Sequence, residues 1–132
     1  MTCHSQLWTQ APMLAPVRVS LATNVPLQWN RVHDLPDFTY FDHSIHIAKG
    51  VGCSTCHGRI DQMPITWRVQ TLYMKWCIDC HRAPQNHLRL RSEIYDMAWQ
   101  PPKNQRPLGE KLVAQYHVDV TGRLTNCSTC HR

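Results

Sequence analysis

The chain has 132 residues, 42% of them hydrophobic and 17% charged, with 9 Pro and only 5 Gly. A chain this short usually needs disulfides, metals or cofactors to complete its core, and its 7 Cys and 9 His are residue types that supply such links. No apolar run reaches the roughly 18 residues of a membrane-spanning helix. The 5 Trp and 4 Tyr argue against a disordered chain.

The elements expected along the chain are short. Residues 5–30 show no periodicity and predict extended coil, and residues 32–42 predict a turn into a short helix that ends at Gly50 and Gly52. A second helix is expected over 70–82, a turn capped by Ser92 after it, and a third helix over 108–118 behind Pro107. No segment predicts a strand. The expected fold class is therefore mainly coil with short α-helices and little or no β-sheet.

Three sequence frames carry the chemistry, each of the form C-x-x-C-H. Their cysteines are Cys53, Cys56, Cys77, Cys80, Cys127 and Cys130, and the histidines that follow are His57, His81 and His131. Two thiols one helical turn apart can form thioethers with the two vinyl groups of one haem, and the next imidazole then reaches the iron. Zinc sites, redox dithiols and disulfides are the competing interpretations. Since zinc does not need His directly after the second Cys, the three frames predict three haems c, with these histidines as proximal ligands.

A low-spin haem needs a sixth ligand, normally His or Met. His43 and His46 stand three residues apart, shortly before the first frame, so one helical turn can direct them to two different haems. His33, beside Asp34, is the next candidate, since a neighbouring carboxylate can orient a ligating ring. Four further candidates are left open, and these are His87, His117, Met63 and Met74.

The first residues predict a fourth site. Cys3-His4 is what remains of a C-x-x-C-H frame that has lost its first Cys, and it accounts for the odd cysteine. Haem attachment of this type requires export, yet the stretch before Arg18 is polar and holds Pro12 and Pro16, so no signal peptide can be drawn. We therefore expect a fragment of a longer protein. Within it, residues 1–132 would be a single multihaem domain, with 1–30 as coil covering a neighbouring haem and 31–132 as a trihaem core.

The charge does not predict a nucleic-acid partner. The formal net charge of +5 could suit nucleic acid or anionic lipid. Each oxidised haem, however, adds roughly one negative charge, because its two propionates outweigh the ferric porphyrin. Three or four haems leave roughly +2 or +1. Most Arg residues are then expected to pair with propionates or to lie on the surface.

These residues resemble those of multihaem cytochromes c. The likeness is carried by residues 34–38, 41–46, 50–59, 74–82 and 127–132, and more narrowly the chain resembles the C-terminal part of the pentahaem subunit of alternative complex III. The F-D-H-x-x-H pairing at 41–46 is also similar to class III, tetrahaem-type cytochromes and their trihaem relatives. Unlike that pentahaem subunit, this sequence is shorter and carries no membrane anchor.

The resemblance implies one-electron transfer in a membrane-associated, quinol-oxidising respiratory complex. Its partners would be the other subunits, with a soluble cytochrome or a terminal oxidase as electron acceptor, at the periplasmic or outer face of the cytoplasmic membrane. No small-molecule substrate is evident. The alternative is a multihaem reductase in which one haem has an open distal site and acts on a small oxyanion. A structural or metal-storage protein is disfavoured, because covalent redox cofactors are costly scaffolding.

Overall fold

The computed structural model describes residues 5–131, and the chain divides into two compact units, Met1–Arg31 and Val32–Arg132. The division lies one residue from the expected boundary between a leading segment and a trihaem core. Whether the whole chain acts as a single multihaem domain stays a prediction. None of the helices in the described part of the chain is long and apolar enough to span a bilayer.

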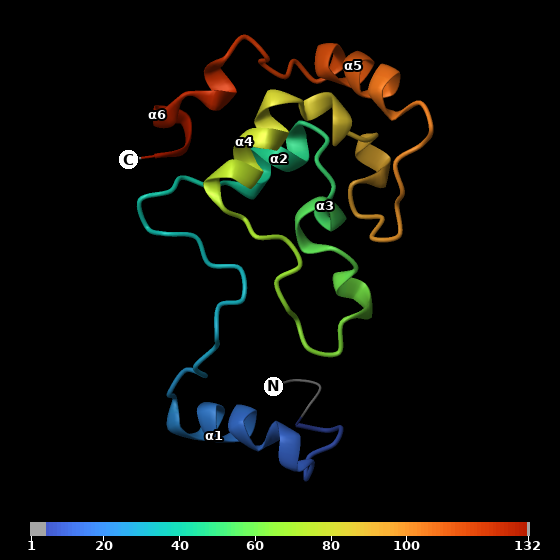
Figure 1. The fold of residues 1–132 in the computed structure, drawn as a ribbon. Helices are drawn as coiled ribbons and strands as arrows, with labels where there is room; N and C mark the ends of the chain where they lie inside the picture. The colour runs from blue at the N-terminus through green and yellow to red at the C-terminus, as the bar shows by residue number, and fades with distance from the viewer. Residues whose placement is uncertain (1–4, 132) are drawn as a thin grey trace. The chain divides into compact units, whose positions relative to one another are not determined.

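The first unit is not the coil expected over residues 5–30. It contains a 3-10 helix, η1 (Pro12–Leu14), followed directly by α1 (Ala15–Thr23), which ends at Asn24 with a left-handed φ of 55° (Figure 1). The expectation was wrong because Pro12 and Pro16 occupy the first turns of these two helices. In a first turn the missing N–H of proline costs no hydrogen bond, so both residues start a helix instead of breaking one.

The second unit consists of short helices joined by coil (Figure 1). Its elements are α2 (His43–Ala48), α3 (Cys53–His57), η2 (Ile60–Gln62), α4 (Met74–Arg82), η3 (Pro84–Asn86), η4 (Arg91–Glu93), α5 (Gln105–Gln115), η5 (Arg123–Thr125) and α6 (Cys127–Cys130). Between residues 5 and 131 no strand forms, and only two isolated bridges pair extended residues, Thr39 with His131 and Val51 with Leu88. The predicted fold class is confirmed.

Three predicted boundaries were displaced. The helix expected from residue 70 begins at Met74, and the helix expected behind Pro107 begins two residues before it, because proline is tolerated anywhere in a first turn. Ser92 lies inside η4 and does not cap it. Leu112 in this helix and Tyr116 directly after it are buried with Leu88.

The polypeptide core is small. Four hydrophobic side chains are buried among the described residues, and they are Leu88, Ile94, Leu112 and Tyr116. Three of them, Leu88, Leu112 and Tyr116, gather where α5 packs on η3 and on the segment that follows η3. A chain of this length normally buries far more apolar area, so the rest of the unit depends on what its cysteines and histidines hold.

We predict that Gly109→Ala destabilises this packing. A Cβ at Gly109 would lie 1.8 Å from the carbonyl oxygen of Gln85, so α5 and η3 would have to separate. Overpacking of this kind costs about 1–3 kcal/mol. Thermal unfolding of the haem-loaded chain, followed by circular dichroism, should show a lower midpoint for this variant. Lys111→Ala, on the exposed side of the same helix, should leave the midpoint nearly unchanged; equal midpoints for both variants would contradict the tight contact.

A short extended segment attaches the first frame to this core. The backbone N–H of Arg89 donates to the carbonyl of Gly50 over 2.9 Å, and that of Cys53 donates to Ile94 over 3.0 Å. Gly50 has a φ of 85°, and a Cβ there would lie 2.7 Å from a ring carbon of Tyr116. Glycine therefore ends α2 and lets the chain turn into α3. Residues 88–94 thus lie against residues 50–53.

Candidate functional site

Each C-x-x-C-H frame places its two cysteines on one helical turn. The first frame forms α3, the second ends α4, and the third forms α6, after which His131 is extended. The side chain of Asn126 begins α6 by accepting from the N–H of Ser128 over 3.0 Å. The thiols of each frame therefore lie one turn apart, as attachment to the two vinyl groups of one haem requires.

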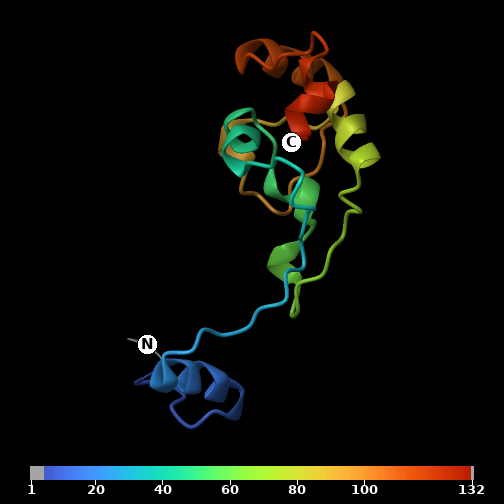
Figure 2. The ribbon, with the colours of Figure 1, turned by 90° about the vertical axis from the view of Figure 1, so that its left-hand side faces the viewer.

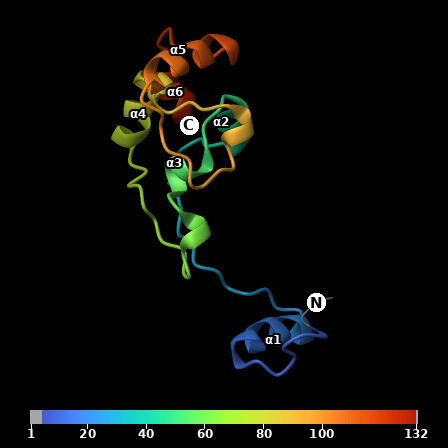
Figure 3. The ribbon, with the colours of Figure 1, turned by 90° about the vertical axis from the view of Figure 1, so that its right-hand side faces the viewer.

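Helix α2 presents one imidazole to each of two frames. The rings of His43 and His57 are stacked at 6.2 Å between centroids with an interplanar angle of 10°, and those of His46 and His81 at 6.2 Å and 24°. An imidazole nitrogen lies about 2 Å from a bound metal ion, so two imidazoles on opposite sides of one iron have ring centres about 6 Å apart. Helices α2 and α4, which overlap in Figure 1, are separated in Figures 2 and 3. The four rings fit two iron sites with paired histidines.

Hydrogen bonds at Nδ1 fix the second of these pairs. The Nδ1 of His46 lies 2.8 Å from the carbonyl oxygen of Asp42, and the Nδ1 of His81 lies 2.9 Å from that of Leu124. With Nδ1–H donating to a carbonyl, Nε2 is left as the nitrogen that can bind a metal. Burial also lowers the pKa of His46, which favours the neutral, ligating form.

Asp42 sets the position of α2 as well. Its carboxylate accepts from the N–H of Ser44 over 2.7 Å, which caps the helix and lowers the pKa of this aspartate. The same residue thus begins the helix with its side chain and orients His46 with its carbonyl. This double role explains why an Asp stands directly before the pair of histidines.

His33 lies beside the first frame and does not face an imidazole of the other two. Its Nε2 is 3.3 Å from the Nδ1 of His57, with the two rings edge to face at 4.4 Å between centroids. Since His43 already faces His57, this position suits a residue that holds the His57 ring. The expectation that His33 is a distal ligand stays a prediction, and the geometry offers it a different role.

The third frame has an aromatic neighbour in place of an imidazole. The ring of Phe38 lies 5.8 Å from that of His131 at an angle of 29°. The segment before α2 is held there by the N–H of Tyr40, which donates to the carbonyl of Cys130 over 2.7 Å. Within residues 5–131, no second imidazole stacks on His131 as His43 and His46 stack on their partners.

All six frame thiols are free, and residues 5–131 contain no group of three His, Cys, Asp or Glu side chains that could hold a metal ion such as zinc. Burial raises the pKa of Cys56 to about 11 and that of Cys80 to about 11. A redox dithiol needs a lowered pKa, so these thiols, protonated at neutral pH, are unlike those of disulfide oxidoreductases.

The frames lie near one another. The electrostatic interactions that raise the thiol pKa values link Cys56 with Cys77, Cys80 with Cys56, and Cys77 with Cys130. The second frame is thus coupled to both of the others. Cofactors attached to these thiols would be neighbours, with the second one in the middle.

Comparison with known proteins identifies the family. The family model described as "Cytochrome c7 and related cytochrome c" matches residues 39–132, which include all three complete frames. The chain belongs to this family. It is therefore a multihaem c-type cytochrome that transfers electrons through its haems. No curated protein matches the chain.

The family explains the arrangement of the site. Thiols paired on helical turns, facing imidazoles 6.2 Å apart and a small polypeptide core are what covalently attached haems would complete. Haem iron supplies the one-electron chemistry when it is bound. The frame cysteines would hold the porphyrin, and the carbonyls of Asp42 and Leu124 would orient the imidazoles of His46 and His81.

The remaining candidates are placed less decisively. His87 lines a pocket with Cys80 and Trp76, and burial lowers its pKa. His117 is exposed, and Met74, at the start of α4, is 63% exposed. Cys3 and His4 lie outside the described residues, so the fourth haem stays a prediction.

Sequence reasoning missed Arg89. Only 1% of this residue is exposed, and its guanidinium lies directly under the first frame. Its sequence context, the interrupted basic run Arg89-Leu90-Arg91, suggested a surface residue or a propionate partner. No periodic pattern in the sequence signals its burial, since Leu88 and Arg89 are both buried and Leu90 is exposed.

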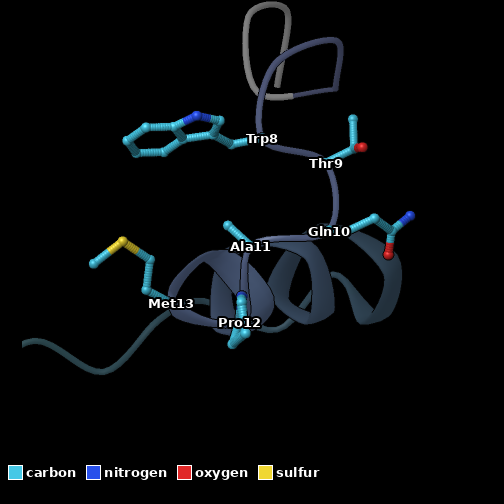
Figure 4. A pocket seen from close by; sticks show the side chains of 6 residues that line it. All are labelled: Trp8, Thr9, Gln10, Ala11, Pro12 and Met13. Atoms are coloured by element: carbon cyan, nitrogen blue, oxygen red, sulfur yellow. The ribbon is translucent and has the colours of Figure 1, made fainter.

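The first unit has a shallow apolar pocket of its own. It is formed by the consecutive residues 8–13, and Figure 4 shows the Trp8 indole and the Met13 side chain extending to the same side of this segment. No cysteine or histidine lines it, so we assign it no part in haem binding.

Proposed function

We propose that the chain carries three haems c, attached at the three complete frames, and passes single electrons between them. The observation that carries this proposal is the position of the two α2 imidazoles: the ring centroids of His43 and His46 lie 6.2 Å from those of His57 and His81, with the facing rings nearly parallel. Two strong imidazole donors keep iron low-spin in both oxidation states, so little structural change accompanies an electron. His57, His81 and His131 would be the proximal ligands, and His43 and His46 distal ligands of the first and second haems.

We further propose that this cytochrome is a subunit of a membrane-associated, quinol-oxidising respiratory complex on the periplasmic side. The sequence segments around the frames support this proposal, since they resemble the corresponding segments of the pentahaem subunit of alternative complex III. Large apolar side chains exposed in the first unit, such as Trp8 at 72%, Met13 at 76% and Trp29 at 80%, suit contact with other subunits. A soluble cytochrome or a terminal oxidase would accept the electrons.

Affinity purification from detergent-solubilised membranes of the native host tests the assignment to a complex. The tagged chain should co-purify with other subunits and with quinol–cytochrome c oxidoreductase activity. A tagged chain that elutes alone from membranes that retain this activity would contradict the assignment and leave the electron-transfer role untouched.

A reductase acting on a small oxyanion is a second candidate, and the third frame favours it. Phe38, whose ring cannot ligate iron, faces His131 where an imidazole faces the other two proximal histidines. We therefore predict one high-spin haem, able to bind carbon monoxide when reduced, beside two low-spin haems. Electron paramagnetic resonance of the oxidised chain checks this, and wholly low-spin spectra would exclude an open site. Turnover of nitrite by the reduced chain would then separate a reductase from a simple carrier.

A further inference from the structure

The first and third frames are the same five-residue word, yet their surroundings differ. Both read Cys-Ser-Thr-Cys-His, at residues 53–57 and 127–131. In the third frame the hydroxyls donate, Ser128 to the side-chain oxygen of Asn126 over 2.9 Å and Thr129 to the carbonyl of Arg123 over 2.7 Å. In the first frame the hydroxyls accept, because a buried cation lies beneath them.

That cation is Arg89. Its Nη2 donates to the hydroxyl oxygens of Ser54 and Thr55 over 3.1 and 2.9 Å, and its Nη1 reaches the carbonyl of Asp96 over 3.2 Å. The other side of the guanidinium is covered by the ring of Trp99, 4.0 Å away. The guanidinium therefore joins Ser54 and Thr55, the two central residues of the frame, to the segment that follows Arg89.

The backbone is shaped around this side chain. A Cβ at Gly52 would lie 2.1 Å from the guanidinium carbon of Arg89, so a larger residue before Cys53 would displace the guanidinium from this position. The bridge between Val51 and Leu88 and the hydrogen bond from Arg89 to Gly50 bring the Arg89 side chain under the frame. The contact is thus built by two segments that lie 35 residues apart in the chain.

The charge of Arg89 is not neutralised by a direct ion pair. Among residues 5–131, no carboxylate lies within 4.0 Å of the guanidinium. The nearest acidic side chains, Glu93 and Asp96, hydrogen-bond elsewhere, Glu93 with the indole of Trp99 and Asp96 with the N–H of Ala98. Arg keeps its charge even when buried, and a buried charge is screened little by salt.

We propose that Arg89 is a positioning residue for the haem of the first frame and that its fixed positive charge raises the reduction potential of this haem. The inference rests on the proposed attachment of a haem to Cys53 and Cys56. Ferrous iron carries one positive charge less than ferric iron, so a nearby cation stabilises the reduced state. In the third frame the same two hydroxyls contact neutral carbonyl oxygens in place of a guanidinium.

The test compares Arg89→Gln with Arg89→Lys in the exported, haem-loaded chain. Midpoint potentials of the individual haems are followed by nuclear magnetic resonance of the haem methyl groups through a redox titration. Arg89→Gln should lower the potential of the first haem by the equivalent of about a tenfold change in its reduction equilibrium, about 59 mV for one electron. The other two haems should shift much less. Arg89→Lys keeps the charge and should restore most of the potential, which a purely structural role would not predict.

A second pair of variants covers the outcome in which Arg89→Gln does not accumulate. Ser54→Ala/Thr55→Val removes both acceptors of the guanidinium, and Ser128→Ala/Thr129→Val makes the same change in the third frame. Peptide mapping of haem-modified cysteines should show reduced haem occupancy at the first frame for the former, and near-normal occupancy at the third frame for the latter. Equal occupancy in the two double variants would overturn the positioning role.

The results separate this inference from the proposed function. A chain with no haem on Cys53 and Cys56 even without substitution would remove the proposed attachment itself. An Arg89→Gln chain that carries haem at all three frames with an unchanged first potential would overturn the role of Arg89 alone.

Discussion

Replacing Cys77 and Cys80 together by Ser is expected to remove the second haem and to unfold most of the second unit. The same double substitution at Cys127 and Cys130 is expected to remove one haem and leave the rest folded. The difference follows from the positions of the frames. Cys77 of the second frame interacts electrostatically with Cys56 of the first and Cys130 of the third, whereas Cys127 of the third frame is exposed.

The packing of α4 explains why the middle frame matters more. This helix contacts both η3, on the side of the α5 core, and η5, which leads into the third frame. His81, at its end, holds Leu124 through its Nδ1. Four buried hydrophobic side chains, all between residues 88 and 116, cannot by themselves order residues 32–131. Without the middle cofactor, α2 and α4 have little polypeptide between them to pack on.

Mass spectrometry and circular dichroism check this comparison. The Cys127/Cys130 variant should keep two haem masses, most of the helical signal and resistance to proteolysis. The Cys77/Cys80 variant should lose more than one haem mass and be degraded during export. If both variants keep two haems and the same helical signal, the middle frame has no special structural role.

The sequence predicts most of the haem site, because covalent attachment ties function to local spacing. The three frames and the helix ahead of the first one are set by residues within a few positions of one another, and the structure has a helical turn at each of them. Likewise, the three-residue spacing of His43 and His46 is enough to predict two targets. One turn of α2 cannot direct both rings to one iron on the same side.

Long-range partners are not predictable in this way. Arg89 reaches the first frame from 35 positions away, and Leu124 reaches His81 from 43 positions away. These contacts depend on how coil segments pass one another, and coil carries no periodicity to read. The prediction of coil over residues 5–30 was wrong because Pro12 and Pro16 start helices that have almost no amphipathic pattern. The packing of Trp99 on Arg89, ten positions away in the chain, is likewise a contact that the sequence does not predict.

Replacing His43 or His46 by Ala is expected to convert one haem from low-spin to high-spin, and a different haem in each case. His43→Ala should change the first haem, since its ring faces that of His57, and His46→Ala should change the second, since its ring faces that of His81. Each variant should keep all its haems, because the thioethers are untouched. Each should also gain carbon monoxide binding at the altered iron.

His33→Ala is the matched control for this pair, because it removes an imidazole that lies near the same frame but at the Nδ1 edge of His57. If His33 only orients that ring, the first haem stays low-spin and its potential shifts modestly, as loss of a partner to a ligating histidine predicts. Electron paramagnetic resonance separates the three variants, and methyl resonances assign each change to a frame. Spectra in both His43→Ala and His46→Ala that match the spectrum of the unsubstituted chain would show that the paired rings of α2 do not ligate iron. Conversion of the first haem to high-spin in His33→Ala would instead make His33 a ligand, as its position beside Asp34 first suggested. It would also require His43 to leave the position it holds opposite His57.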